Sequence, residues 1–581
     1  MPLMIRSRPS TVLVIGTGGA GLRAAIAAHD AGGEVIVVGR RPRLDAHTVL
    51  ASGGINAALG TRDPQDSWQQ HAADTLREGY LLGDPRIVER VCVEAPAAIA
   101  ELDEWGCPFA RTEDGRLDQR FFGAHRWRRT CFAGDYTGRA VLQTLSKQID
   151  ARGITVLEDH YVSELLVSDG TCFGAFAFDM HTGEQVALVS SAVVLCGGGH
   201  TRLWRRSSSR RDENFGEGIY LALKAGCALK DMELVQFHPT GMVAPEEVAG
   251  TLVTEAVRGE GGRLYNAEGE RFMERYDPQR LELSTRDRVA LANYTEIVEG
   301  RGGPNGGVYL DITHLGKEQI LERLPRMHRQ FVEYQMLDIS RDRMEVAPTA
   351  HYTMGGIVVN PDTHATEVAG LFAAGECTAG LHGANRLGGN SLIETVVYGR
   401  HAGEAALAFA YSGDVALRPG AVIREAGDEL DSRVRPGTEL ARQLQRSLRD
   451  LLWEHAGVVR DADGIAAGLA RVAEVRGAIP TIDVRYSAEG WLDLALACDV
   501  RAGTALAEAT LVGAAERRET RGCHNRADFP DLDPAQVVNH HVRLDGVALV
   551  TWDEPVPPIP AELQPWVDES ITFDWSDRLV E

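Results

Sequence analysis

The chain has 581 residues, of which 44% are hydrophobic and 25% charged, a composition typical of a globular protein with more than one domain. Its formal net charge of -23 argues against nucleic acid or an anionic membrane as a direct partner. No apolar run is long enough to span a bilayer, so no transmembrane segment is predicted.

The first residues lack the long apolar stretch and small-residue cleavage site of a signal peptide, so cytosolic residence is expected. The nine cysteines are scattered, and no two of them form a CxxC pair. No zinc or iron–sulfur site is therefore predicted in this chain, and any cluster would belong to another subunit.

A βαβ unit is predicted at the start of the chain. Residues 11–16 (TVLVIG) read as a buried parallel strand, residues 20–31 as an alanine-rich helix, and Glu34–Val38 as a second strand. The turn between the first strand and the helix fits G-x-G-x-x-G, with the glycines Gly16, Gly18, Gly19 and Gly21.

This glycine loop predicts a dinucleotide site. The first two glycines let the backbone turn and approach a pyrophosphate, and the third permits close helix–strand packing. The helix N-terminus supplies N–H groups to the phosphates. The second strand ends at Val38-Gly39-Arg40 rather than at an acidic residue, so the loop alone does not choose between NAD and FAD.

Later segments suggest the order of the remaining parts. Apolar runs at 192–196 and 370–375, each followed by glycines, read as two further central strands. The segment 236–352 is dense in charge and reads as an inserted domain. From about 430 the apolar residues recur at helical spacing, and the proline-rich tail after Asp528 is expected to be irregular.

The stretch from Ala46 through LASGGINAALG resembles the flavin-attachment segment of succinate dehydrogenase and fumarate reductase flavoprotein subunits. Six later segments match other hallmarks of that family: Gln236–Gly241, Thr254–Gly262, STRDRVA around Arg286, His351–Ile357, His382–Leu392 and Arg521–Pro530. Cys523 stands where the last of these usually has alanine. The motifs agree in order and spacing over residues 10–530.

The resemblance implies an α/β fold. We expect a discontinuous Rossmann-like FAD-binding domain at 1–235 and 353–430, with an inserted α+β capping domain at 236–352. A helical domain at 431–520 and an irregular C-terminal segment at 521–581 would follow.

The resemblance also implies FAD as the cofactor, bound covalently through His47. Glu217 stands where the family commonly has Asp near the flavin ribose. The other residues carried over to the flavin are Thr48, Gly53, Gly54, Glu376, Ser391 and Leu392.

A dicarboxylate needs cationic and hydrogen-bonding groups at both ends, in a site dry enough for hydride transfer. Arg386 can clamp a carboxylate with two hydrogen bonds. The resemblance assigns Arg386, His238, His351 and Thr254 to substrate binding, and Phe122 to covering the bound substrate.

In the family, a hydride leaves one methylene carbon of succinate while a base takes the proton from the next. The matching base here is Arg286, although arginine ordinarily stays protonated. Glu255 and Arg258 match the relay that links this arginine to solvent; the alternative is an ordinary salt bridge.

Succinate-oxidising members typically carry Gln where Ser52 stands, and fumarate reductases often carry Glu, so the direction stays open. The segment FFGAHRWRRTCFAGDYTGR is short and leans toward L-aspartate oxidase, a soluble relative that normally lacks the flavin-linking histidine; His47 favours succinate or fumarate. A subunit whose own chemistry has decayed is a third reading, disfavoured because Arg286, His351 and Arg386 are present.

We therefore expect a succinate dehydrogenase flavoprotein subunit, with fumarate reductase and L-aspartate oxidase as alternatives. An iron–sulfur subunit would take the electrons, and membrane anchor subunits would bind indirectly, so that quinone is reached only through partners. The expected place is peripheral, on the cytoplasmic side of the plasma membrane.

Overall fold

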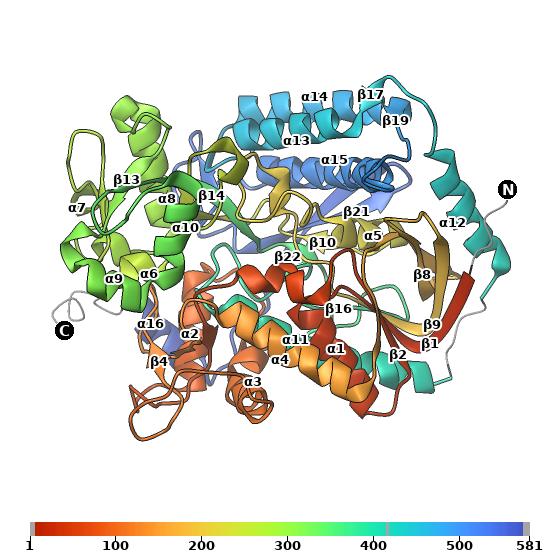
Figure 1. Ribbon diagram of the computed structural model, residues 1–581, viewed down its shortest axis with the longest axis horizontal. Coiled ribbons are helices and arrows are strands. Elements are labelled where there is room, and N and C mark those ends of the chain that lie inside the picture. Colours follow the sequence, from red (N-terminus) through yellow and green to blue (C-terminus); the bar gives the residue numbers. More distant parts are fainter. Residues whose placement is uncertain (1–5, 414–417, 573–581) are drawn as a thin grey trace.

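The computed structural model describes residues 6–413 and 418–572 (Figure 1). Its largest sheet has seven strands in the order β6-β2-β1-β9-β8-β7, with β16 also paired to β9. The parallel strands are β1 (Arg6–Ile15), β2 (Val35–Val38), β6 (Thr155–Leu157), β9 (Gln185–Leu195) and β16 (Leu371–Ala373). The antiparallel strands are β7 (His160–Ser168) and β8 (Thr171–Asp179). The predicted βαβ unit and both later strands are confirmed.

Three helices run side by side along one face of this sheet: α1 (Gly19–Asp30), α4 (Thr137–Arg152) and α11 (Asn390–Tyr411) (Figure 1). Helices α1 and α11 touch through their backbones. A Cβ added to Gly399 would lie 2.6 Å from the carbonyl oxygen of Ala20, and one added to Gly403 would lie 2.2 Å from that of Ala24. Only glycine allows this approach.

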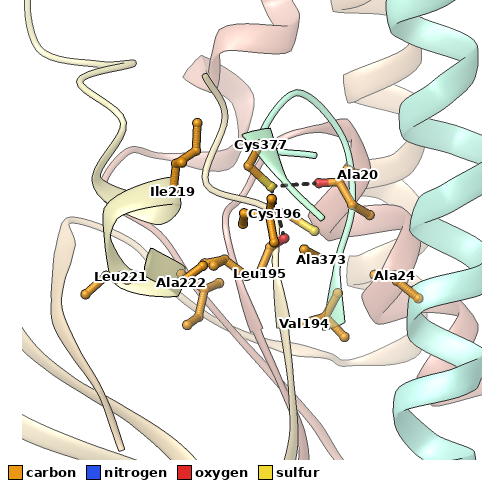
Figure 2. Close-up of a cluster of buried hydrophobic side chains, with 14 of the residues drawn as sticks. Ala20, Ala24, Val194, Leu195, Cys196, Ile219, Leu221, Ala222, Ala373 and Cys377 are labelled. Carbon is orange, nitrogen blue, oxygen red and sulfur yellow. Dashed lines mark hydrogen bonds between the residues drawn. The ribbon is translucent and has the colours of Figure 1, made fainter. Parts of the chain in front are cut away.

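Small apolar side chains fill the space where β9 and β16 meet helix α5 (Glu217–Ala225) (Figure 2). Cys377 sits among them, and its thiol donates hydrogen bonds to the carbonyl oxygens of Leu195, at 3.3 Å, and Ala374, at 3.4 Å. This packing fixes the loops that follow β9 and β16, because both loops leave the sheet from a fully buried position.

A second, four-stranded antiparallel sheet has the order β11-β14-β13-β12. Its strands are β11 (Val235–Met242), β12 (Arg263–Tyr265), β13 (Val308–Asp311) and β14 (Met344–Thr353), and helices α8 (Arg286–Glu296) and α10 (Pro325–Gln335) belong to the same part of the chain. These elements have a hydrophobic core of their own, which includes Phe272 and Phe331. A separate core supports the proposed capping domain at 236–352.

Helices α13 (Ala441–His455), α14 (Ala462–Ala478) and α15 (Leu492–Glu516) pack together in a layer at the top of Figure 1. A further helix, α12 (Gly420–Ser432), precedes them and packs against β7 and β8. The helical structure expected after residue 430 is confirmed. We propose that the chain is divided as the sequence predicts, into a FAD-binding domain (1–235 and 353–430), a capping domain (236–352), a helical domain (431–520) and a C-terminal segment (521–581).

The prediction of an irregular C-terminal segment is wrong. Strands β21 (Val538–Asp545) and β22 (Ala548–Pro555) form an antiparallel hairpin, and helix α16 (Gln564–Thr572) follows. The hairpin extends a sheet that also contains β10 (Leu229–Lys230) and β15 (Gly356–Ile357). Its turn contains Asp545-Gly546, and Gly546 has φ +61°. This dipeptide favours a tight hairpin turn, although prolines lie nearby in the sequence.

Candidate functional site

A deep cavity opens at the carboxyl end of β1 and reaches the second sheet. Two of the predicted site residues, Gly21 and Arg258, lie just outside its lining. The others line it together: Gly16, Gly18, Gly19, His47, Thr48, Gly53, Gly54, Phe122, Glu217, His238, Thr254, Glu255, Arg286, His351, Glu376, Arg386, Ser391 and Leu392. Residues separated by more than 300 positions in the chain therefore meet at one place.

The glycine loop lies where β1 passes into α1. Gly16 has φ +121°, and a Cβ there would lie 2.1 Å from the carbonyl oxygen of Cys196. A Cβ on Gly21 would lie 1.9 Å from the carbonyl oxygen of Gly16. The first glycine thus permits the turn and the last permits helix–strand packing, as a dinucleotide loop requires.

The predicted attachment loop lies directly against the start of α1. The Thr48 hydroxyl oxygen accepts a hydrogen bond from the backbone N–H of Gly19 at 3.0 Å. Nδ1 of His47 lies 2.8 Å from Oε1 of Glu213. Burial alone would lower the pKa of His47, but Glu213 outweighs it and raises that pKa. Burial alone would raise the pKa of Glu213, but the contact with His47 lowers it to about 2.

Arg40 occupies the place where the fingerprint usually has an acidic residue. Its guanidinium makes two 2.8 Å hydrogen bonds to Asp499 on α15, and its Nη1 lies 3.5 Å from Oε1 of Glu217. Oε2 of Glu217 is buried and has no hydrogen-bond partner, so it can accept a hydrogen bond from a ligand in the cavity. Glu217 therefore fits the ribose contact predicted for it.

The far end of the cavity is built from short loops. A Cβ on Gly53 would lie 2.4 Å from Cζ of Phe122, so the phenyl ring packs directly on this glycine. Oε1 of Glu376 accepts a hydrogen bond from the backbone N–H of Thr353 at 3.0 Å. Ser391 and Leu392 lie in the first turn of α11. Gly53, Phe122, Glu376, Ser391 and Leu392 therefore line one continuous cavity.

Arg286 is held by two hydrogen bonds and an ion pair at the start of α8. Its Nε and Nη2 each lie 2.7 Å from Oε2 of Glu255, and its Nη1 donates to Oε1 of Gln236 at 3.0 Å. Arg258 Nη2 lies 3.8 Å from the same oxygen of Glu255. Burial alone would raise the pKa of Glu255, but Arg286 and Arg258 lower it to about 2. This carboxylate is charged and links both arginines.

Arg386 is 3% exposed, and no carboxylate of the described residues forms an ion pair with it. Its Nε is buried without a hydrogen-bond partner, while its guanidinium carbon lies 4.3 Å from the centre of the Tyr352 ring. Burial, and then the charge of Arg286, lower the pKa of Arg386 to about 10. A buried, unpaired cation of this kind favours an anionic ligand.

Two histidines stand beside these arginines, with ring centres 5.2 Å apart. Burial, and then the charge of neighbouring arginines, place the pKa of His238 and that of His351 well below the usual histidine value. Nδ1 of His238 accepts a hydrogen bond from the backbone N–H of Thr240 at 3.2 Å. The neutral ring carries one N–H, which can serve as a hydrogen-bond donor.

Sequence reasoning missed three residues of the site. Gln236, which holds Arg286, lies inside a quoted motif and could have been found there. Ser208 Oγ lies 2.8 Å from Nδ1 of His351, and Glu213 contacts His47 across 166 residues of sequence. The last two lie in the segment RRSSSRRDEN, which carries no signal that points to either histidine.

The described residues contain no group of three or more His, Cys, Asp or Glu that could hold a metal ion. All nine cysteines are free thiols and buried. None of the helices in the described part of the chain is long and apolar enough to cross a membrane. The residues of the cavity fit FAD, because its lining joins the glycine loop at the start of α1 to Glu217, whose buried Oε2 has no hydrogen-bond partner.

Comparison with known proteins agrees with this site. Residues 11–392 match the FAD binding domain family, and residues 445–555 match the fumarate reductase flavoprotein C-term family. The chain is 42% identical to one subunit of the fumarate reductase (CoM/CoB) of Methanothermobacter marburgensis, over 90% of this chain and 95% of that one. It is 37% identical to the succinate dehydrogenase flavoprotein subunit of Rickettsia bellii, over 92% of each chain.

Solved structures show the same similarity. A chain of the Mycobacterium smegmatis Sdh1 complex with UQ1 superimposes with a TM-score of 0.88 at 39% identity, covering 96% of both chains. A chain of a quinol-fumarate reductase solved with menaquinol superimposes with a TM-score of 0.90 at 32% identity, covering 95% of this chain and 99% of that one. The protein belongs to the FAD-dependent succinate dehydrogenase and fumarate reductase flavoprotein subunit family.

Proposed function

We propose that the chain oxidises succinate to fumarate as the flavoprotein subunit of a succinate dehydrogenase. The observation that carries this proposal is Arg386, a buried cation without an ion pair among the described residues, facing the same cavity as Arg286. A dianionic substrate would give Arg386 its missing partner, and His238, which lines the same cavity, would donate a hydrogen bond to a carboxylate oxygen. Thr254 and His351 line the same end, and Phe122 covers it.

The flavin would lie along the rest of the cavity, with its phosphates at the start of α1 and its ring beside Gly53, Gly54 and Phe122. Glu217 would bind the ribose, and Glu376, Ser391 and Leu392 the ribityl chain and ring. When bound, FAD supplies the two-electron acceptor that this oxidation requires.

Arg286 would act as the base in a transient neutral form. Glu255, 2.7 Å from two of its nitrogens, would first accept a proton from the guanidinium, and Arg286 would then take the proton that leaves the substrate. Arg258 follows at 3.8 Å, with Nε and Nη2 buried and without hydrogen-bond partners. The alternating charges of this series allow a proton to move without leaving two like charges in contact.

We expect FAD to be linked covalently through His47. The ring lines the cavity, and its contact with Glu213 through Nδ1 leaves Nε2 available for the bond. After denaturation in acid, the protein should keep its yellow colour, and the peptide containing His47 should carry the mass of the flavin. A protein that releases all its flavin on denaturation would contradict the linkage and favour L-aspartate oxidase.

We further propose that electrons leave through an iron–sulfur subunit and that membrane anchor subunits bind through it. The described residues offer no metal cluster ligands, and a flavin reduced by two electrons must pass them on singly to reach quinone. The expected place is peripheral, on the cytoplasmic side of the plasma membrane.

The isolated, flavin-loaded chain should oxidise succinate with an artificial dye but not with quinone or oxygen. Oxygen-dependent oxidation of aspartate by the single chain would overturn the proposal. Fumarate reduction is the second candidate, favoured by the name of the M. marburgensis relative. Rates measured in both directions on the intact complex, with one electron carrier at a series of potentials, distinguish the two.

A further inference from the structure

Nine arginines lie between the flavin-attachment loop and α13, in a chain whose net charge is -23. We call them the arginine rim: Arg139, Arg202, Arg205, Arg206, Arg210, Arg211, Arg326, Arg446 and Arg449. They come from four parts of the sequence, so the pattern is not visible as one run of charge.

Hydrogen bonds tie the rim to the site and to the neighbouring layers. Arg326 Nη1 donates to Oγ of Ser52 at 2.9 Å, beside the space proposed for the flavin ring. Arg210 Nη1 donates to the carbonyl oxygen of Asp45 at 2.6 Å. Arg449 Nη2 donates to the carbonyl oxygen of Arg205 at 2.7 Å. The rim is therefore a continuous border from the flavin-attachment loop to the helical layer.

Few carboxylates neutralise this border. Six of its arginines form no ion pair with any residue that the structure describes: Arg139, Arg202, Arg206, Arg211, Arg326 and Arg449. Of the other three, Arg210 pairs with Asp45 at 3.0 Å. The pairs Arg205–Asp450, at 3.9 Å, and Arg446–Glu246, at 3.7 Å, are long and exposed, so each contributes little. The border stays locally positive.

The charged form of Arg202 is destabilised by burial and by the neighbouring arginines. Arg202 is 5% exposed, and its Nε is buried without a hydrogen-bond partner. Burial, and then the charges of Arg449 and Arg211, lower the pKa of Arg202 to about 9. Such a group is stabilised when an anionic surface is brought against it, because the anion offsets the repulsion among the arginines.

The rim also begins where electrons would leave. The backbone N–H of Arg210 donates to Oε1 of Glu213 at 2.9 Å, and the same oxygen lies 2.8 Å from Nδ1 of His47. We propose that the arginine rim is the docking surface for an acidic face of the iron–sulfur subunit, which it steers toward the edge of the flavin at His47. This inference rests on the proposed function and names the surface through which it operates.

The test uses electron acceptors of opposite charge on the flavin-loaded full chain. Flavin is first reduced with dithionite, so the measurement does not depend on the natural substrate, and its reoxidation is followed by stopped flow. In the double variant Arg205→Glu/Arg211→Glu, the second-order rate with anionic ferricyanide at low ionic strength should fall by about 10-fold. The rate with cationic hexaammineruthenium should rise, and both differences should shrink in high salt.

The matched control is Arg400→Glu/Arg485→Glu, which changes the net charge equally. Both arginines are exposed and pair with a local carboxylate, Glu404 and Asp483 respectively. Equal effects in the two double variants, or none in the rim variant, would overturn the proposal. The rate of flavin reduction by succinate should be unchanged in the rim variant. If succinate reduces the flavin of neither the parent nor the variant, the proposed function fails, but the comparison of electron acceptors remains valid.

Assembly gives the second measurement. Expressed with its native iron–sulfur subunit, the parent chain should co-purify with that subunit at low salt, and so should the control variant. The rim variant should lose it. Retention of the subunit by the rim variant at low salt would overturn the proposal. A second outcome would also overturn it. If the rim variant alone lost binding to phosphatidylserine vesicles while its binding to the subunit was unchanged, the rim would be a membrane contact.

Discussion

Replacing Arg286 by lysine should leave a folded, flavin-binding protein whose turnover with succinate falls by about 10³-fold or more. That factor corresponds to roughly 4 kcal/mol of lost transition-state stabilisation. Arg286 uses three nitrogens at once, two on Glu255 and one on Gln236. Lysine offers one nitrogen on a differently shaped chain and cannot hold both partners while facing the substrate.

Arg288→Lys is the matched control. Arg288 lies on the same helix, its side chain is 59% exposed, and its contact with Asp277 is long, at 3.7 Å. Its substitution should change turnover less than twofold. Steady-state rates with a dye acceptor, on variants checked for flavin content, measure both effects. If Arg286→Lys keeps turnover within tenfold of the parent, Arg286 does not transfer the proton.

Replacing Arg129 by methionine should lower the free energy of unfolding by about 3–5 kcal/mol. Its side chain, like those of Asp66 and Asp74, is fully buried, and Nη2 lies 2.8 Å from Asp66 and 2.9 Å from Asp74. Methionine would fill much of the volume but leave two carboxyl groups without their cation.

Arg128→Met provides the comparison one residue away. That side chain is 47% exposed and pairs with Asp63 at 2.8 Å, so its loss should cost less than about 1 kcal/mol. Urea denaturation followed by circular dichroism measures both. Adding Asp66→Asn to Arg129→Met should recover part of the loss. Equal stabilities for the two single variants would show that the buried ion pairs contribute nothing beyond packing.

Much of the fold could be predicted because glycines and apolar runs mark it locally. Gly16 and Gly21 occupy positions where a side chain would overlap the backbone, so their pattern fixes the first βαβ unit. The C-terminal hairpin contradicts the expectation of an irregular tail, because Asp545-Gly546 lies between strand-like runs while the prolines that suggest irregularity follow Glu554. Helix α12 was not predicted, and Ala426, Gly427 and Leu430 are its buried residues.

The candidate site was predictable where its residues fall in motifs, and not where they act across the fold. Arg286, Glu255 and Arg386 stand in recognisable segments, and the structure brings them to one cavity. Glu213 has no such context, since only folding brings it within 2.8 Å of His47. Arg40 pairs with Asp499 across 459 residues, a contact that spacing alone cannot predict. Long-range electrostatic partners therefore remained invisible in the sequence.

The glycine contacts between α1 and α11 have a consequence for how the protein is assembled. Gly18 and Gly19 lie at the start of α1, Ser391 and Leu392 lie at the start of α11, and all four line the cavity. Because the two backbones touch, neither helix can shift without displacing the other. The two ends of the cofactor site therefore form in a single cooperative step, although some 370 residues separate them, and a folding chain presents to the flavin either both ends or neither.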